Sequence, residues 1–207
     1  MNKEIEYLDI YDENKNYLGK EDRKIVHEKG LWHKTIHCWL FDKEGNIYFQ
    51  IRANNEGFYT TASGHIQAGE TINEAFDREV KEEIGYDVDE SKLIFVKEVT
   101  WMMDKIKKDG SKFIDRAWAN VCICPYEGND TDFDFHNDEV DGVVKVNAKD
   151  TLDLFNDKLE KIAATIITDE TNTEKEITKE EFLLNEGETY LGKYGFVLES
   201  VVENTRS

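Results

Sequence analysis

The chain of 207 residues carries 45 acidic and 26 basic side chains, giving a formal net charge of −19 at pH 7, and 39% of its residues are hydrophobic. These values suit one domain, or one domain with an appendage, and disagree with disorder along the whole chain. A protein this negative repels nucleic acid and anionic membranes unless a basic patch outweighs the field, and the longest basic run is short, so we expect neither as a partner.

The sequence also lacks the usual marks of membrane insertion and export. No run of about eighteen apolar residues occurs, and the first residues lack the apolar stretch of a secretory signal. The three cysteines are too few for a disulfide framework. We therefore expect a cytoplasmic protein with reduced thiols.

Strands and a few helices alternate along the chain. Apolar and β-branched runs predict strands at 4–10, 34–41, 47–52, 93–104, 112–124 and 140–146, with hairpin turns at 43–46 and 108–111. Helical spacing predicts helices at 72–84 and 149–167, a loop at 168–180, and one or two further helices at the end. This order predicts an α/β (α+β) fold, with one domain at 1–150 and a helical extension at 151–207 packed on it.

The helix predicted at 72–84 has clear ends. Thr71 and Glu74 have the spacing of a capping box, and Gly85 suits a left-handed helix end. On a helical wheel, three glutamates border the apolar ridge and lie off the exposed face: Glu79, Glu82 and Glu83. The exposed face is expected to hold Glu74, Asp77 and Lys81.

Carboxylates beside a buried ridge are costly to desolvate without a cationic partner. A divalent cation is one such partner, and clustered carboxylate oxygens are what Mg²⁺ or Mn²⁺ prefers. The alternative is a plain acidic, solvated helix face, which is common in so acidic a chain.

The spacing Gly, five residues, Glu, seven residues, Arg-Glu-apolar-x-Glu-Glu-x-Gly resembles the Nudix box. Its fixed positions are Gly64, Glu70, Arg78, Glu79, Glu82, Glu83 and Gly85, and Tyr86 is a mild departure where an aliphatic residue is usual. The resemblance implies a Nudix fold, a mixed β-sheet sandwiched between helices with the box as a loop–helix–loop. It also implies Mg²⁺- or Mn²⁺-dependent hydrolysis of a diphosphate bond in a nucleoside-diphosphate-type small molecule.

The resemblance further implies a role for each box residue. Glu79 and Glu83 are expected to bind the metal, with Glu82 as a further ligand or the catalytic base. The backbone carbonyl of Gly64 is expected to be another ligand. Arg78, which we count among the catalytic residues, and Glu70 are expected to orient the carboxylates.

A wider similarity over about residues 5–145 points to the Nudix branch that includes type I isopentenyl diphosphate isomerase. The isomerase needs a cysteine immediately before the Gly-His pair, where this chain has Ser63. The isomerase also uses histidines and a pair of glutamates around a metal. In this chain, His33 and His65 match two of those histidines, and His27 lies near the place of a third. The best counterpart of the glutamate pair is Asp115. A hydroxyl exchanges protons far less readily than a thiol, so we favour a hydrolase, with an isomerase-like enzyme as the alternative.

Several residues outside the helix are further candidates. Glu139 is either a base or added ligand, or an ordinary turn carboxylate. His65 either contacts phosphate or packs within its loop. Arg52 either clamps phosphate or forms a surface salt bridge, and Ser63 is a candidate substrate contact.

Three aromatic residues, Trp101, Trp118 and Tyr59, are expected to pack in the core rather than stack on a ligand. His33 and His37 are either ligands or ordinary sheet residues, and their place near or on a strand favours the latter. A non-catalytic Nudix-fold nucleotide-binding module remains a second alternative, and a homodimer is one possible assembly.

Overall fold

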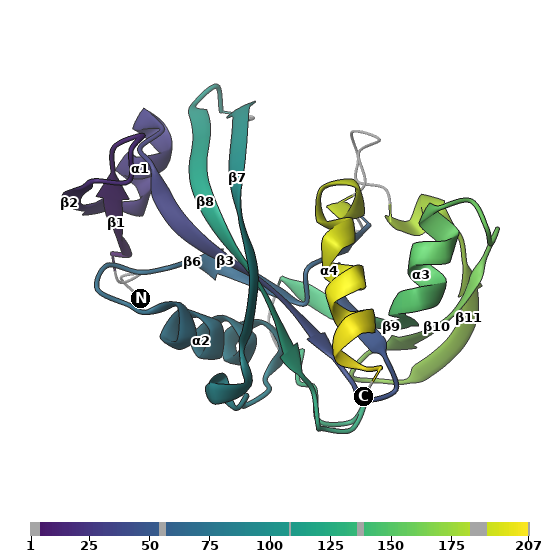
Figure 1. Cartoon of the computed structure of the whole chain (residues 1–207). Helices are drawn as coiled ribbons and strands as arrows, with labels where there is room; N and C mark the ends of the chain where they lie inside the picture. Colours follow the sequence, from purple (N-terminus) through teal and green to yellow (C-terminus); the bar gives the residue numbers. More distant parts are fainter. Residues whose placement is uncertain (1–4, 54–56, 108, 136–138, 183–189, 207) are drawn as a thin grey trace.

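The computed structural model describes residues 5–53, 57–107, 109–135, 139–182 and 190–206, with backbone alone for 190–193. Its centre is a mixed sheet whose strand order is β11-β10-β9-β4-β3-β8-β7, with β5 and β6 paired to β4 and β3 (Figure 1). The strands of this sheet are β3 (His33–Phe41), β4 (Asn46–Arg52), β5 (Phe58–Tyr59), β6 (Ala62–His65), β7 (Ile94–Ile106), β8 (Lys112–Pro125), β9 (Val140–Asn147), β10 (Ile162–Ile167) and β11 (Asn172–Ile177). Strands β3 and β8 are parallel, and the other pairs are antiparallel.

Helices cover both faces of this sheet (Figure 1). Helix α2 (Ile72–Ile84) packs through Phe76, Val80 and Ile84 against one face. Helices α3 (Ala148–Phe155) and α4 (Tyr190–Asn204) lie on the other face, where Trp39 and Tyr194 belong to one buried cluster. Alternation of side chains along β3 explains the division, because successive residues of a strand point to opposite faces. The predicted α+β sandwich is confirmed.

A small N-terminal unit stands at one end of the sheet. Strands β1 (Tyr7–Tyr11) and β2 (Tyr17–Asp22) form a hairpin, and α1 (Arg23–Lys29) follows directly. Only a strand at 4–10 was expected in this region. The unit contacts the main sheet through α1 and β8 and through β1 and β3. It therefore brings α1 next to the end of β3.

The two strands predicted around the turn at 43–46 form, but they are paired with each other only next to the turn. In the ladder between β3 and β4, Phe41 pairs with Ile47. Further along, β3 pairs instead with β6, and β4 pairs with β5. The short strand β6 thus lies beside the divergence, with Gly64 opposite Ile36 of β3.

The expectation of one helix over 149–167 was wrong in its second half. Helix α3 ends at Phe155, and residues 162–167 form β10, which pairs with β9. The segment 168–180, expected to be a loop, contains β11 paired with β10. The run Ile-Ala-Ala-Thr-Ile-Ile is rich in β-branched residues, which favour a strand. Its pairing with the edge of β9 therefore outweighs the helical spacing of its apolar residues.

Two short 3₁₀ turns, Glu90–Lys92 and Lys179–Phe182, complete the described secondary structure. None of the helices in the described residues is long and apolar enough to cross a bilayer. The division of the chain at residue 150 stays a prediction.

Candidate active site

Helix α2 begins and ends at the predicted residues. Glu74 accepts a hydrogen bond from the Thr71 backbone N–H at 2.8 Å, and Thr71 accepts one from the Glu74 N–H at 3.2 Å. This reciprocal cap stabilises the helix by about 1 kcal/mol. Gly85 ends the helix at φ 69°, where a side chain would collide with Asp134. These caps fix the rotation of the helix, and with it the direction of its glutamates.

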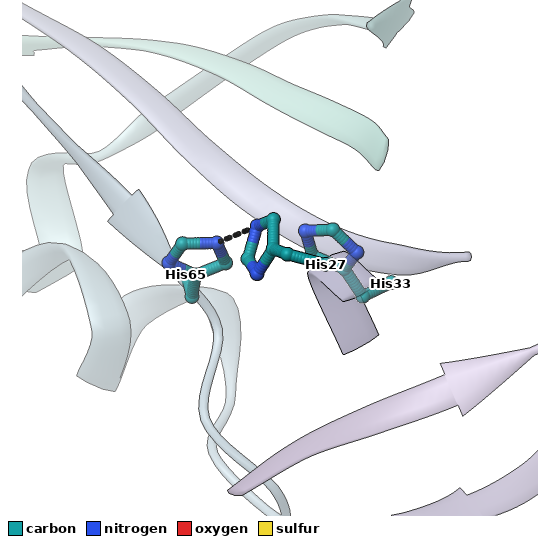
Figure 2. A group of neighbouring side chains, drawn as sticks. All are labelled: His27, His33 and His65. Carbon is teal, nitrogen blue, oxygen red and sulfur yellow. Dashed lines mark hydrogen bonds between the residues drawn. The ribbon is translucent and has the colours of Figure 1, made fainter. Parts of the chain in front are cut away.

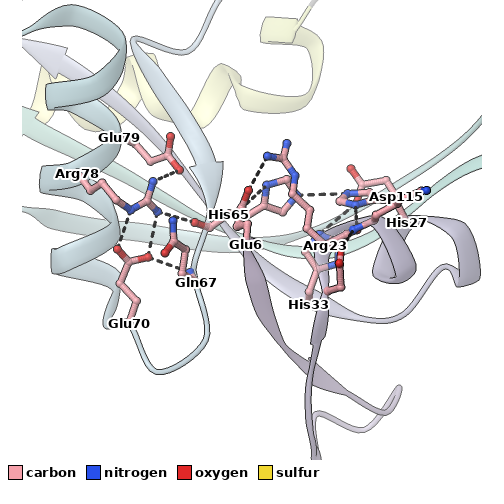
Figure 3. A network of polar contacts seen from close by, with 12 residues as sticks. Glu6, Arg23, His27, His33, His65, Gln67, Glu70, Arg78, Glu79 and Asp115 are labelled. Atoms are coloured by element: carbon pink, nitrogen blue, oxygen red, sulfur yellow. Dashed lines mark hydrogen bonds and ion pairs between the residues drawn. The ribbon is translucent and has the colours of Figure 1, made fainter. Parts of the chain in front are cut away.

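Arg78 is the hub of the polar network beside the helix (Figure 3). Its guanidinium donates to Glu79 at 2.7 Å, to both oxygens of Glu70 at 2.8 and 3.0 Å, and to the carbonyl of His65 at 2.9 Å. Burial alone would lower the pKa of Arg78, but the bonds with Glu70 and the charge of Glu79 raise it above its usual range. Arg78 therefore stays charged and joins the loop before the helix to the helix itself.

Glu79 lies against the backbone of Gly64. Its side chain is 13% exposed, and a Cβ placed on Gly64 would overlap both carboxylate oxygens. Gly64 is thus a glycine because the carboxylate occupies the space of a side chain. The predicted neighbours, the Gly64 backbone and Glu79, come together in the structure.

Glu83 lies one turn further along and is held by neutral donors. One of its oxygens accepts hydrogen bonds from the Ser63 N–H and from the Gln50 side-chain amide, both at 3.0 Å. Burial, and to a lesser extent the charge of Glu79, raises the pKa of Glu83 to about 8. Burial also raises the pKa of Glu79 to about 7, against the lowering effect of Arg78.

Glu82 is more exposed than the helical wheel predicts. Its side chain is 61% exposed, and it contacts Arg78 at 3.3 Å. The expectation that it lies off the exposed face was wrong, although Ala75 on the same side of the helix is fully buried. Its exposure leaves it accessible from solvent next to Glu79.

These residues fit a hard divalent cation. Glu79 and Glu83 are one helical turn apart and share a partly buried position next to the Gly64 backbone. Arg78 offsets part of their charge, and the raised pKa values show that further positive charge is favoured there. Carboxylate and carbonyl oxygens are the donor set that Mg²⁺ and Mn²⁺ prefer.

A pH dependence of stability follows for the metal-free protein. The pKa values of about 7 and 8 for Glu79 and Glu83 lie above that of an unfolded glutamate, so the folded state holds extra protons between about pH 4.5 and 8. The free energy of unfolding therefore falls as the pH rises through this window. We expect the decrease in the free energy of unfolding across this pH window to be smaller in Glu83→Gln than in the wild type, by roughly 1–3 kcal/mol.

Urea unfolding in EDTA at pH 5 and pH 8.5 measures this difference between the wild type and Glu83→Gln. Asp77→Asn, on the exposed face of α2, is the matched control for a lost negative charge. Equal pH slopes for the wild type and Glu83→Gln would contradict the assignment of a desolvated carboxylate.

Three histidines gather beside the Arg78 network (Figure 3), and Figure 2 shows them alone. His27 comes from α1, His33 from β3 and His65 from β6, and one ring nitrogen of each lies within 4.8 Å of the others. The Nε2 atoms of His27 and His65 are 3.2 Å apart. The structure thus unites the three histidines, including His27, whose helix was not expected.

Backbone carbonyls fix the tautomers of two of these rings. The Nδ1 of His27 bonds the Arg23 carbonyl at 2.8 Å, and the Nδ1 of His33 bonds the Leu31 carbonyl at 3.0 Å. A carbonyl only accepts, so Nδ1 carries the proton and Nε2 of each neutral ring offers a lone pair. Burial lowers the pKa of all three histidines, which favours the neutral form.

Asp115 of β8 adds an oxygen to this cluster. Its Oδ1 lies 3.4 Å from the Nε2 of His33, and both atoms are buried without a hydrogen-bond partner among the described residues. Two buried acceptors that face each other are unfavourable unless a proton or a cation lies between them. Three imidazoles and a carboxylate are a donor set that suits Zn²⁺, Mn²⁺ or Fe²⁺.

The other candidates lie at varied distances from these groups. The Arg52 Nε donates to Gln50 at 3.0 Å, and its guanidinium stacks over Tyr59 at 4.3 Å, so the surface salt bridge has no support among the described residues. Ser63 contributes its backbone N–H to Glu83. Glu139 is exposed, and its carbonyl accepts from Ala53 next to Arg52 in the sheet.

The aromatic and remaining histidine candidates pack in the core. Trp118 is buried, Trp101 and Tyr59 pack against the cluster around Trp39, and His37 bonds the hydroxyl of Tyr194 at 2.9 Å. The site residue that the sequence reading missed is Gln50. The signal in the sequence is a polar residue within the mostly apolar strand predicted at 47–52.

Comparison with known proteins places these features in a family. The family model described as NUDIX domain matches residues 31–166. An uncharacterized Nudix hydrolase of Clostridium acetobutylicum is 31% identical over 202 residues, which cover 93% of this chain and 94% of the relative. The chain belongs to the Nudix hydrolase family.

More partial similarities fit this placement. An isopentenyl-diphosphate Delta-isomerase of Photorhabdus laumondii is 32% identical over 87 residues, 40% of this chain and 49% of that enzyme. A crystal structure from Deinococcus radiodurans superposes with a TM-score of 0.52 at 18% identity, over 73% of this chain and 89% of that one. The latter shows the fold alone. The predicted family and its partial similarity to the isomerases are both confirmed.

Proposed function

We propose that this protein is a Mg²⁺- or Mn²⁺-dependent hydrolase that cleaves the phosphoanhydride bond of a small-molecule diphosphate. The observation that carries the proposal is the pair of partly buried carboxylates, Glu79 and Glu83, gathered beside the Gly64 backbone. Family membership supports the hydrolytic reaction.

In this proposal Glu79, Glu83 and the Gly64 carbonyl hold the metal. When bound there, the cation supplies charge neutralisation for the diphosphate and lowers the pKa of a nearby water. Arg78 holds Glu79 in place, and Glu70 holds Arg78.

Glu82 is the accessible carboxylate, and it accepts the proton of the attacking water. Water oxygen bonds to one phosphorus, the bridging P–O bond breaks, and two phosphorylated fragments leave. Arg52 and His65 contact the phosphate groups, and Glu139, immediately before β9, is a second candidate base.

A substrate panel tests the reaction. Nucleotide sugars, nucleoside di- and triphosphates, dinucleotides and prenyl diphosphates are incubated with Mg²⁺ or Mn²⁺, and the products are identified by mass spectrometry. We expect cleavage at a phosphoanhydride bond that EDTA abolishes. Binding of a panel member without cleavage under any metal would favour the non-catalytic nucleotide-binding module.

A second candidate function, an isomerase acting on a prenyl diphosphate, is favoured by the cluster of His27, His33, His65 and Asp115. Ser63 opposes it, because its hydroxyl stands where a thiol is needed and a hydroxyl exchanges protons far less readily than a thiol. With isopentenyl diphosphate we therefore expect no isomerised product by NMR. We also expect Ser63→Ala to keep hydrolysis within about threefold, since Ser63 acts through its backbone N–H. Formation of the isomer by the wild type, lost in Ser63→Ala, would reverse the order of the two functions.

A further inference from the structure

Gln50 lies between two charged groups of the proposed site. It sits on β4 with 2% of its surface exposed. Its side-chain amide nitrogen donates to Glu83 at 3.0 Å and to the Thr61 carbonyl at 3.4 Å. Its amide oxygen accepts from the Nε of Arg52 at 3.0 Å. One neutral side chain therefore joins a carboxylate on α2 to a guanidinium at the end of β4.

The chemistry of its neighbours fixes the orientation of this amide. The carboxylate of Glu83 accepts, and the guanidinium of Arg52 only donates, so nitrogen must face Glu83 and oxygen must face Arg52. A glutamate at position 50 has no proton to donate when ionised, and a leucine can neither donate nor accept. The position requires both a donor and an acceptor at the length of a glutamine.

The bond to Gln50 restrains Glu83. Together with the Ser63 N–H, it places two neutral donors on the same carboxylate oxygen. Two hydrogen bonds to one oxygen restrict rotation of the carboxylate about its terminal torsion, which is otherwise broad. The plane of the proposed metal ligand is thus set from the sheet and not by the helix alone.

The bond to Gln50 also restrains Arg52. The guanidinium is held at Nε by Gln50 and on its face by the Tyr59 ring, 4.3 Å away. No ion pair of Arg52 occurs among the described residues. The guanidinium is planar, and contacts at Nε and on its face restrain the direction in which its two terminal nitrogens point, which suits bidentate binding of a phosphate group.

We propose that Gln50 is a positioning residue that sets the distance and orientation between the metal ligand Glu83 and the phosphate-binding Arg52. It thereby fixes where the two phosphates of the substrate lie relative to the metal. This inference rests on the proposed hydrolase function and assigns a role to a residue that touches neither the metal nor the substrate.

Gln50→Leu tests the proposal with two readouts. We expect the Kd for Mn²⁺, measured by electron paramagnetic resonance without substrate, to rise about fivefold or more, and KM to rise about tenfold. Thr165→Val on the distant strand β10 is the matched control. It removes a hydrogen bond to Glu174 of β11 and should change neither value. If Gln50→Leu does not fold, Gln50→Asn replaces it in both measurements. Asparagine keeps the amide, but its side chain is one methylene too short to reach both partners.

A double-mutant cycle separates positioning from general damage. In an Arg52→Leu background and at saturating Mn²⁺, Gln50→Leu should raise KM by less than twofold, because its partner Arg52 is already gone and saturating metal offsets the lost bond to Glu83. Additive effects on KM, or a Kd for Mn²⁺ within twofold of the wild type, would overturn the proposal. The metal measurement needs no turnover, so an absence of hydrolysis on every substrate would count against the proposed function and leave this test intact.

Discussion

Replacing Glu83 by glutamine lowers metal-dependent hydrolysis at least about 100-fold while the protein remains folded. The amide oxygen of the new side chain can still accept from the Ser63 N–H and from Gln50, so the local structure is kept. What is lost is the negative charge, which is the part that a divalent cation needs. Steady-state kinetics with Mg²⁺ titration measures the effect.

Asp77→Asn is the control for Glu83→Gln, because it removes one carboxylate from the exposed face of the same helix. It should keep activity within about twofold. If both variants lost activity equally, the effect would come from the net charge of α2 and not from a metal ligand.

Replacing Gly64 by alanine should lower activity about as strongly as loss of a ligand, by roughly 100-fold. The new Cβ would overlap the carboxylate of Glu79, and the bond of Glu79 to Arg78 keeps that carboxylate from moving freely. The expected result is weaker binding of Mn²⁺ together with lower kcat. Calorimetric titration with Mn²⁺ separates this from a loss of folded protein.

Gly195→Ala is the matched control, since nothing lies within 4 Å of a Cβ at that helical position. It should leave metal binding unchanged and stabilise α4 by up to about 1 kcal/mol. Wild-type affinity for Mn²⁺ in Gly64→Ala would contradict the prediction, because it would show that metal binding does not require the Glu79 carboxylate to lie against Gly64.

The local part of the site was predictable from sequence. The helix at 72–84 carries its own start and stop signals, so its bounds and the direction of Glu79 and Glu83 follow from spacing. Glu82 was misplaced because a helical wheel does not show how far the core extends around the helix. That limit depends on β3 and β6, which are distant in sequence.

The parts that depend on long-range pairing were harder to predict. The segment 149–167 has apolar residues at helical spacing, yet β10 pairs with β9 and takes its second half into the sheet. The histidine cluster needs α1, which stands in the N-terminal unit, and β6, which lies at the divergence of two strands. Neither feature is set by local propensity.

Gln50 illustrates the same limit at the level of one side chain. It belongs to no motif, and its two partners come from α2 and from two residues further along its own strand. Its polarity within an apolar strand marks it as unusual, but only the packing of α2 on the sheet gives that polarity a partner. The homodimer stays a prediction.

The most direct test of the central claim is a crystal structure of the protein with Mn²⁺ and a non-hydrolysable diphosphate, with the metal located by anomalous scattering. We expect an anomalous peak bounded by the carboxylates of Glu79 and Glu83 and by the carbonyl of Gly64, with the diphosphate against it. A catalytically active crystal form whose bound diphosphate and metal lie elsewhere, with these carboxylates bare, would contradict the account.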